Sequence, residues 1–311
     1  MKKFLIAIIA ICSLVAVGCA GDGDEVRTEQ TTSEPAYNPA IYAVNYPLAY
    51  FAERIAGSRA WVEFPTPSGV DPAFWRPDAE AVAAFQDADL ILLNGAAYAR
   101  WTSSVSLPPS RTVNTSEAFA GRYIVVADAA THSHGPGGEH AHTGTAFTTW
   151  LDFSQAVEQA RSILDALNER WPGQSGRWNE GFSALEKDLQ ALDADLQNTV
   201  AGKQSLALVA SHPVYQYLAR RYSLNIASVM WEPDEFPSER QWRDFAALVN
   251  ETGAAWMIWE GEPLPATRER LEEIGVNSVV FDPCGNTPDE GDFLTVMSAN
   301  IERIKSVYRQ K

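Results

Sequence analysis

Short apolar runs alternate with amphipathic segments along most of the chain, and this alternation predicts two successive α/β units. β-Branched and aromatic residues fill the short runs, whereas the segments between them carry apolar residues at helical spacing. Such an order is typical of a mostly parallel sheet flanked by helices. The expected strands cover residues 41–44, 61–64, 89–94 and 123–128 in the first unit, and residues 206–210, 226–230, 255–259 and 278–281 in the second.

A long helical segment separates the two units. From residue 154 to residue 200 apolar positions recur at spacings of three and four, and Pro172-Gly173 interrupts the run. We therefore expect two helices, of which the second, at 176–200, connects an N-terminal lobe at 40–175 with a C-terminal lobe at 201–311. Because ligands of open parallel sheets bind beyond the carboxyl ends of the strands, we expect a ligand cleft between the lobes.

The first residues have the pattern of a bacterial secretion signal. Lys2 and Lys3 precede an apolar run that ends at Gly18-Cys19. A cysteine after a small residue is typical of a lipoprotein, so we expect residues 1–18 to be removed and Cys19 to carry a membrane-anchoring lipid in the periplasmic or other extracytoplasmic space. The polar residues 19–39 then form a flexible tether. A soluble periplasmic product is one alternative, because Ala16 stands where such signals usually have Leu; a transmembrane anchor is another, but the run is shorter than the roughly 20 residues needed.

Charge and cysteine content narrow the classes of function. The formal net charge of −16, which becomes more negative when Lys2 and Lys3 are removed, argues against a nucleic-acid partner, since phosphates are repelled. The same charge weakly concentrates cations, although solubility alone also explains it. Only Cys284 remains after the signal and the lipid site are set aside, so a disulfide framework is excluded and a hydrophobic core must stabilise the fold.

Four of the five histidines fall in one Gly-rich loop at 131–146, which has no apolar periodicity. Neutral imidazole is a common zinc ligand, so this tract can wrap a divalent cation weakly. The alternative is a solvated loop whose histidines bind nothing. The candidate loop ligands are His132, His134, His140 and His142.

The remaining histidine, His212, follows the β-type run LALVA and precedes Pro213. Asp282 has the matching position after SVVF and also precedes a proline. Both side chains are therefore expected at strand ends that face the cleft. A lone histidine is more often structural, but two such groups at strand ends could bind one metal ion.

Five features follow one another in the order found in a known family: NYPLAYFAERIAG, PSGVDPAFWRPDAEAVAAFQDADLILLNG, TWLDFSQA, SHPVYQYLARRYSL and the late acidic residue Asp282. With these features the chain resembles the zinc- and manganese-binding solute receptors of ABC importers over nearly all of its mature length. The resemblance implies two His ligands from the N-terminal lobe, a His and a carboxylate from the C-terminal lobe, small lobe movements, and delivery of the cation to a cognate ABC permease. We also expect a monomer.

The N-terminal half of this implied ligand set is missing. Ala73 stands where the family has its first His, and Thr148 stands where it has the second, so the metal site is degenerate. Two protein ligands are too few for tight zinc binding. Either other groups complete the site or the cargo differs, and a carboxylate-rich site would favour manganese or another hard cation. The candidates for completing the site are His140, His142, Asp71, Glu232, Glu260 and Cys284.

Aromatic residues keep a second class of ligand open. Trp75, Trp150 and Trp231 lie in segments expected to border the cleft, where they could hold an organic solute or a metal chelate, although core packing explains any one of them.

The chain lacks a nucleophile elbow, a phosphate-binding loop and a metalloprotease motif, so an enzyme is not expected. The favoured function is a receptor for a divalent cation, zinc first, as transported cargo. The alternatives are a receptor for a non-metal or chelated solute and a metal chaperone acting through the His-rich loop.

Overall fold

The computed structural model describes residues 38–126, 131–133, 139–141 and 144–309. Its N-terminal lobe contains a parallel sheet of strand order β2-β1-β3-β4, in which Ile41 pairs with Val62 on one side and with Leu90 on the other. Because the strands are parallel, each connecting segment returns the chain to the same end of this sheet. The strands are β1 (Ala40–Ala43), β2 (Trp61–Glu63), β3 (Leu90–Leu93) and β4 (Thr112–Asn114).

A second parallel sheet, of strand order β10-β9-β11-β12, forms the C-terminal lobe. All four residues of the central strand β9 are buried, as expected for a parallel strand covered on both faces. The strands are β9 (Ala207–Ala210), β10 (Asn225–Ser228), β11 (Trp256–Trp259) and β12 (Asn277–Val280), and the helices around them are α5 (Gln216–Tyr222), α6 (Glu239–Thr252) and α7 (Pro265–Glu273).

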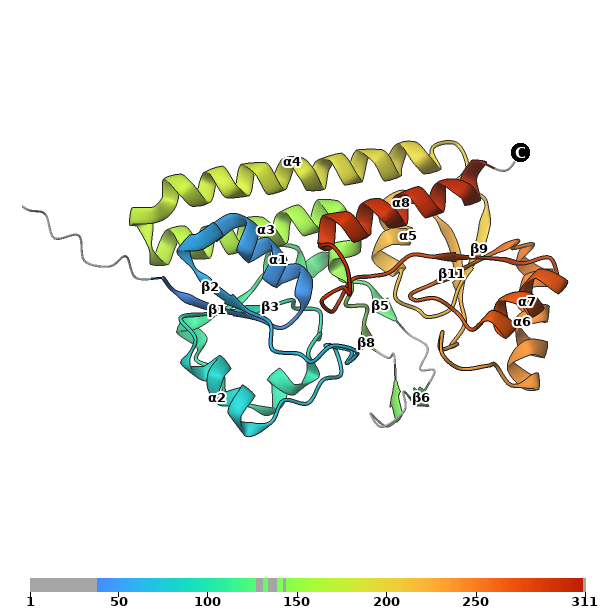
Figure 1. Ribbon diagram of the computed structural model, residues 1–311, viewed down its shortest axis with the longest axis horizontal. Helices are drawn as coiled ribbons and strands as arrows, with labels where there is room; N and C mark the ends of the chain where they lie inside the picture. The colour runs from blue at the N-terminus through green and yellow to red at the C-terminus, as the bar shows by residue number, and fades with distance from the viewer. Residues whose placement is uncertain (1–37, 127–130, 134–138, 142–143, 310–311) are drawn as a thin grey trace, which may run out of the picture. The chain divides into compact units, whose positions relative to one another are not determined.

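A layer of long helices joins the two lobes (Figure 1). Helix α4 packs against α1 and α3 beside the N-terminal sheet and against α5 and α8 beside the C-terminal sheet. Its apolar stripe, Trp178, Phe182, Leu185, Leu189, Leu192, Leu196 and Val200, is buried along its length. The helices of this layer are α1 (Tyr46–Ala56), α3 (Phe153–Arg170), α4 (Ser175–Val200) and α8 (Phe293–Arg309).

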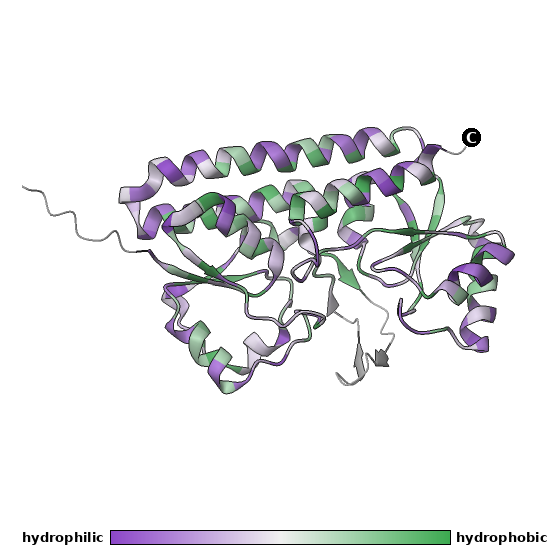
Figure 2. Cartoon of the chain, in the orientation of Figure 1, coloured by the Kyte–Doolittle hydropathy of each residue, from purple (hydrophilic) through white to green (hydrophobic). Residues whose placement is uncertain are grey.

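One continuous apolar core extends from the N-terminal sheet through the helical layer to the C-terminal sheet. A smaller core lies beneath α6 and α7, where Trp231 packs against Trp242 and Phe245. In Figure 2 the strands of the two sheets carry many hydrophobic residues, whereas the long helices combine hydrophobic and hydrophilic residues along their length. Helix α2 and short 3₁₀ turns complete the described fold: α2 (Ala79–Asp87), Gly57–Arg59, Arg100–Ser104, Pro109–Arg111, Glu117–Arg122, Thr149–Leu151 and Pro172–Gln174.

The fold class predicted from the sequence is confirmed, but one expected strand was wrong. Within the segment 123–128, the described strand is only β5 (Val125–Val126), which pairs antiparallel with β8 (Gly144–Thr145) outside the main sheet. The fourth strand of the sheet is instead β4, whose sequence Thr-Val-Asn is too short and polar to give a periodic signal. The proposed domain boundaries within the chain stay a prediction.

Parts of the predicted organisation lie outside the described residues. These parts include the signal at 1–18, Cys19 and nearly all of the tether, together with His134 and His142. Within the His-rich segment, β6 (Thr131–Ser133) pairs antiparallel with β7 (Glu139–Ala141), and the register places His132 opposite His140. In the part of the chain that is described, no helix is both long and apolar enough to cross a bilayer.

Candidate metal centre

Four titratable side chains follow the carboxyl ends of the four strands in the C-terminal sheet. His212 follows β9, Glu232 follows β10, Glu260 comes directly after β11, and Asp282 follows β12. Because the strands are parallel, their carboxyl ends meet at one edge of the sheet. Strand β9 lies between β10 and β11, so His212 is placed between the two glutamates.

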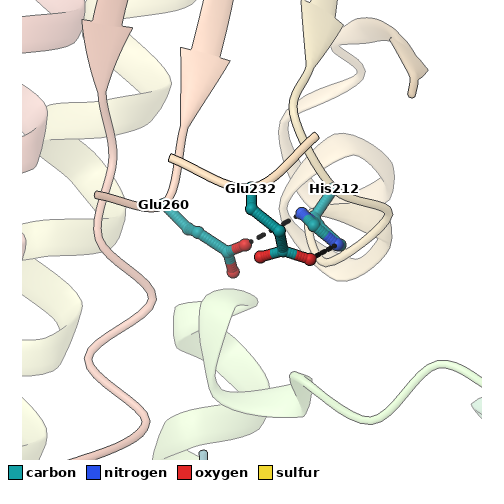
Figure 3. A group of neighbouring side chains, drawn as sticks. All are labelled: His212, Glu232 and Glu260. Atoms are coloured by element: carbon teal, nitrogen blue, oxygen red, sulfur yellow. Dashed lines mark ion pairs between the residues drawn. The ribbon is translucent and has the colours of Figure 1, made fainter. Parts of the chain in front are cut away.

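The His212 ring lies between the carboxylates of these two glutamates, one beside each ring nitrogen (Figure 3). Its Nε2 lies 3.2 Å from Glu232 Oε1, and its Nδ1 lies 3.0 Å from Glu260 Oε1. Ligand atoms of the three residues all lie within 4.8 Å of one another, and the exposed fractions of the side chains are 2% for His212, 15% for Glu232 and 26% for Glu260. One imidazole and two carboxylates at this spacing can share a divalent cation.

Charge coupling within the cluster changes how His212 titrates. Burial alone would lower the pKa of His212, but hydrogen bonds and charge attraction from Glu232 and Glu260 outweigh it and raise the pKa to about 10. His212 is therefore an imidazolium at neutral pH when the site holds no metal. A bound cation would take the place of that proton between the same carboxylates.

Asp282 lies near this cluster but does not belong to it. Strand β11 lies between β12, which precedes Asp282, and β9, which precedes His212. Two strand spacings amount to about 10 Å, whereas β10 and β11, which precede the two glutamates, are direct neighbours of β9. The Asp282 carboxylate accepts the backbone N–H of Cys284 at 2.7 Å. Burial raises the pKa of Asp282; the bond from Cys284 opposes this rise, and the charge of Glu260 adds to it.

The cluster opens into a cavity of about 570 Å³ between the lobes. Of the residues that the sequence suggested as cleft lining, five do line this cavity: Asp71, Thr148, Trp150, Glu232 and Glu260. His212 and Asp282 line it as well. Trp75 does not, because its ring packs edge-on against Trp101 with ring centroids 6.2 Å apart. Trp231 is a core residue, as described above.

The N-terminal side of the cavity offers little to a metal ion at the two positions where the family resemblance implies histidines. Ala73 is buried and has no donor atom in its side chain. The Thr148 hydroxyl donates a hydrogen bond to the carbonyl of Val214. One oxygen of Asp71 accepts the backbone N–H of Ala73 at 2.8 Å, which fixes the turn.

Aromatic rings cover this side instead, and sequence reasoning found only one of them. Phe147 packs edge-on against Phe74 and Tyr98, with ring centroids 6.2 and 5.3 Å apart, and Tyr98 packs against Trp150 at 5.6 Å. All four rings line the cavity. We call Phe74, Tyr98, Phe147 and Trp150 the aromatic wall. Phe74 lies between β2 and α2, and the other three rings lie between β3 and α3, in segments that gave no periodic signal.

A buried polar network holds the aromatic wall in place. Asn94, at the end of β3, donates to the carbonyl of Phe147 at 2.9 Å and accepts from Gln159 of α3 at 3.1 Å. Thr149 donates to the same Asn94 oxygen at 3.2 Å. On the opposite lobe, Trp150 Nε1 donates to the carbonyl of Pro283 at 2.7 Å. These bonds fix the rings relative to the strand ends that carry the cluster.

The remaining candidates from the sequence are Cys284 and the four loop histidines. Cys284 is buried with a φ of 56° and is not among the residues that line the cavity. For His132 and His140 the structure gives only the backbone pairing described above. The four loop histidines thus stay predictions as metal ligands.

The fold and the site define a two-lobed protein with a cluster of one histidine and two glutamates in the cavity between its lobes. Residues 41–307 match the family described as zinc-uptake complex component A, periplasmic, and the chain belongs to that family. This membership confirms the resemblance found in the sequence and the class of function predicted there, the metal-binding component of an ABC importer with a divalent cation as cargo. The family acts in transport rather than in catalysis.

Individual relatives agree with this assignment. The chain is 22% identical to the high-affinity zinc uptake system protein ZnuA of Bacillus subtilis, over 96% of this chain and 95% of that protein. It is 26% identical to the manganese-binding lipoprotein MntA of Halalkalibacterium halodurans, over 75% of this chain and 72% of that protein. The Zn(II)-bound ZnuA-like domain of Streptococcus pneumoniae AdcA shares the fold, with a TM-score of 0.73 and 22% identity over 88% of this chain and 100% of that one.

Proposed function

We propose that the protein captures a divalent cation, zinc first, through His212, Glu232 and Glu260 and presents it to an ABC permease. The observation that carries the proposal is the clamped His212 ring, whose two nitrogens each face a carboxylate across about a hydrogen-bond length. A cation of ordinary ligand distance, about 2.0–2.2 Å to nitrogen and oxygen, fits among these three groups after small side-chain rotations. Asp282 lines the same cavity and is proposed as an additional carboxylate ligand when no other ligand occupies the open coordination position of the ion.

The donor set also bears on which ion is preferred. One imidazole with two or three carboxylates contains more oxygen than nitrogen, and oxygen donors suit manganese better than imidazole-rich sets do. Zinc accepts the same donors in a tetrahedral or five-coordinate arrangement. We therefore propose zinc as the cargo and manganese as its nearest competitor.

The His-rich loop is proposed to assist capture rather than to hold the ion on its own. His132, His134, His140 and His142 offer imidazoles close in sequence to Thr148, where a family ligand is absent. Deletion of residues 132–142 should therefore slow zinc capture and leave the stoichiometry of one zinc unchanged. Complete loss of zinc in the deletion, with His212→Ala silent, would instead identify a chaperone that works through its loop.

The proposed location follows from the N-terminal pattern and the family. The chain would be secreted, acylated at Cys19 and held at the outer face of the membrane as a monomer without enzymatic activity. Mass spectrometry of the chain purified from membranes checks this, since a diacylglyceryl group on Cys19 is expected. An unmodified chain in the soluble fraction would contradict the anchor.

Metal analysis of the mature chain tests the proposed ligands. We expect one tightly bound zinc in the wild-type protein, and a loss of affinity of at least about tenfold in His212→Ala and in Glu260→Gln. Glu262→Gln is the matched control, because Glu262 is exposed, pairs with Arg268 at 2.7 Å and does not line the cavity. Unchanged zinc affinity in both ligand variants would reject the proposal.

A further inference from the structure

The cavity is larger than a metal ion needs. A shell of about six waters around a cation fills roughly 180 Å³ at about 30 Å³ per water, whereas the cavity measures about 570 Å³. A volume of roughly 300–1,000 Å³ is usual for pockets that hold organic ligands. The ion alone therefore leaves most of the space between the lobes unfilled.

Ligand atoms are also distributed unevenly around the cavity. The clustered donors His212, Glu232 and Glu260 all come from the C-terminal sheet. Three protein donors leave at least one coordination position of a zinc ion open. Among the described residues, the N-terminal lobe contributes one carboxylate to the cavity lining, that of Asp71, beside the rings of the aromatic wall, which offer no metal-binding atom at the positions nearest Ala73 and Thr148.

Charge restricts what can fill the remaining space. Among the described residues that line the cavity, four are carboxylates, Asp71, Glu232, Glu260 and Asp282, and none is Lys or Arg. A divalent cation balances at most two of these charges. An anionic co-ligand would therefore be repelled, whereas a neutral ligand would not.

We infer that the cargo is a metal complex, in which the cation held by His212, Glu232 and Glu260 carries a neutral, ring-containing nitrogen ligand that packs against the aromatic wall. This inference rests on the proposed metal site. The nitrogen atoms of such a ligand fill the open coordination positions, and its ring makes edge-to-face contacts with Phe147 and Tyr98. The small organic ligand thereby supplies the donors that Ala73 and Thr148 do not.

Titration of the zinc-loaded mature chain with 2,2′-bipyridine, a neutral planar nitrogen ligand, tests the inference. Native mass spectrometry should show one bipyridine added per zinc-loaded protein, and calorimetry should show at least about tenfold weaker binding to the metal-free protein. Oxalate is the matched ligand control, since it also donates two atoms but is anionic and has no ring. Its binding should be at least about tenfold weaker than that of bipyridine.

Two phenylalanine variants test the role of the wall. Phe147→Ala should lower bipyridine affinity by about tenfold or more, a larger factor than any loss of zinc affinity, because one face of the ring site is removed. Phe236→Ala is the matched control, because Phe236 is 48% exposed and does not line the cavity. Equal effects of the two variants would overturn the inference.

Several outcomes separate failure of this inference from failure of the metal site. A protein that retains zinc but rejects bipyridine, loses its zinc to bipyridine, or binds bipyridine equally without zinc contradicts only the inferred complex. Bipyridine binding that appears only after deletion of residues 132–142 contradicts it too, because the chain's own loop would then fill the open positions. A protein that binds no zinc before any chelator is added contradicts the proposed function itself.

Discussion

A metal ion bound at His212 would replace the proton that the imidazole carries in the metal-free protein. Without metal, its proton lies between Glu232 and Glu260, and the raised pKa of about 10 keeps that proton in place at neutral pH. As a metal ligand the imidazole must be neutral. The proton thus stabilises two neighbouring carboxylates until a cation replaces it, since removing one partner of a buried charge cluster is costly.

The titration of His212 predicts how stability depends on pH in the metal-free protein. Its pKa is about 10 in the folded state and 6.5 as the ordinary value, so its stabilisation is complete below pH 6.5 and is lost as the pH rises toward 10. One proton corresponds to a loss of at most about 1.4 kcal/mol per pH unit in this window. Urea unfolding in the presence of a chelator should show this decline, and His212→Gln should flatten it. Equal slopes for the two proteins would show that His212 is not charged in the folded state.

Thr148 offers a direct test of the degenerate half of the site. Because its side chain lines the cavity, Thr148→His should place an imidazole opposite the His212 cluster and raise zinc affinity by about tenfold or more, at the cost of the hydrogen bond to the Val214 carbonyl. Competition with a zinc chelator measures the change. Thr145→His is the control for an added histidine outside the cavity. A similar gain in both variants would mean that any new imidazole suffices.

The sequence predicted the position of a site residue where that residue follows an expected strand. His212 and Asp282 were placed at strand ends, and both do line the cavity. Glu232 and Glu260 were named only as additions, although the same rule applied to all four strands of the second sheet would have ranked them equally. Their closeness to His212 depends on the strand order β10-β9-β11-β12, and sequence order alone does not give that spatial order.

At the scale of elements, the sequence predicted the connecting helices and seven of the eight strands in the two parallel sheets, and it missed one short strand. The two strands β1 and β3 and the whole helical layer follow from apolar runs and from spacings of three and four. Strand β4 has three residues and segment 123–128 is apolar, so the pattern favoured the wrong segment. Pairing with neighbouring strands decides whether such a short segment joins the sheet, because a segment of two or three residues has little intrinsic preference for the strand conformation.

Packing between α1 and α4 predicts opposite effects for two glycines in one helix. A Cβ at Gly181 would lie 2.5 Å from the carbonyl oxygen of Ile55 and 2.7 Å from that of Arg54, so Gly181→Ala should force the helices apart and lower the free energy of unfolding by about 1–3 kcal/mol. Gly176 in the same helix has open space around it. Gly176→Ala should leave stability unchanged or raise it by up to about 1 kcal/mol. Chemical denaturation of both variants measures the difference, and equal values would contradict the close approach.

At the scale of the whole described fold, direct hydrogen bonds connect the segment 283–286 of the C-terminal lobe with the N-terminal lobe. Trp150 Nε1 donates to the Pro283 carbonyl at 2.7 Å, and Asn286 Nδ2 donates to the Val70 carbonyl at 2.7 Å. At a different position, the Tyr217 hydroxyl donates to the Ala146 carbonyl at 3.0 Å. The helical layer and its continuous core add a rigid support to these bonds. Such a structure favours small adjustments over a wide hinge motion.

Small-angle scattering can therefore detect whether the lobes move when zinc binds. We expect the radius of gyration of the mature chain to change by less than about 1 Å between the chelator-treated and zinc-loaded states, because direct hydrogen bonds and the continuous apolar core hold the two lobes together. The double variant Trp150→Phe/Asn286→Ala removes interlobe hydrogen bonds of the segment 283–286 and should expand in the metal-free state, then contract when zinc is added. A contraction of the wild-type chain as large as that of the double variant would mean that the bonds form only around the ion, and that the lobes of the free protein separate in solution.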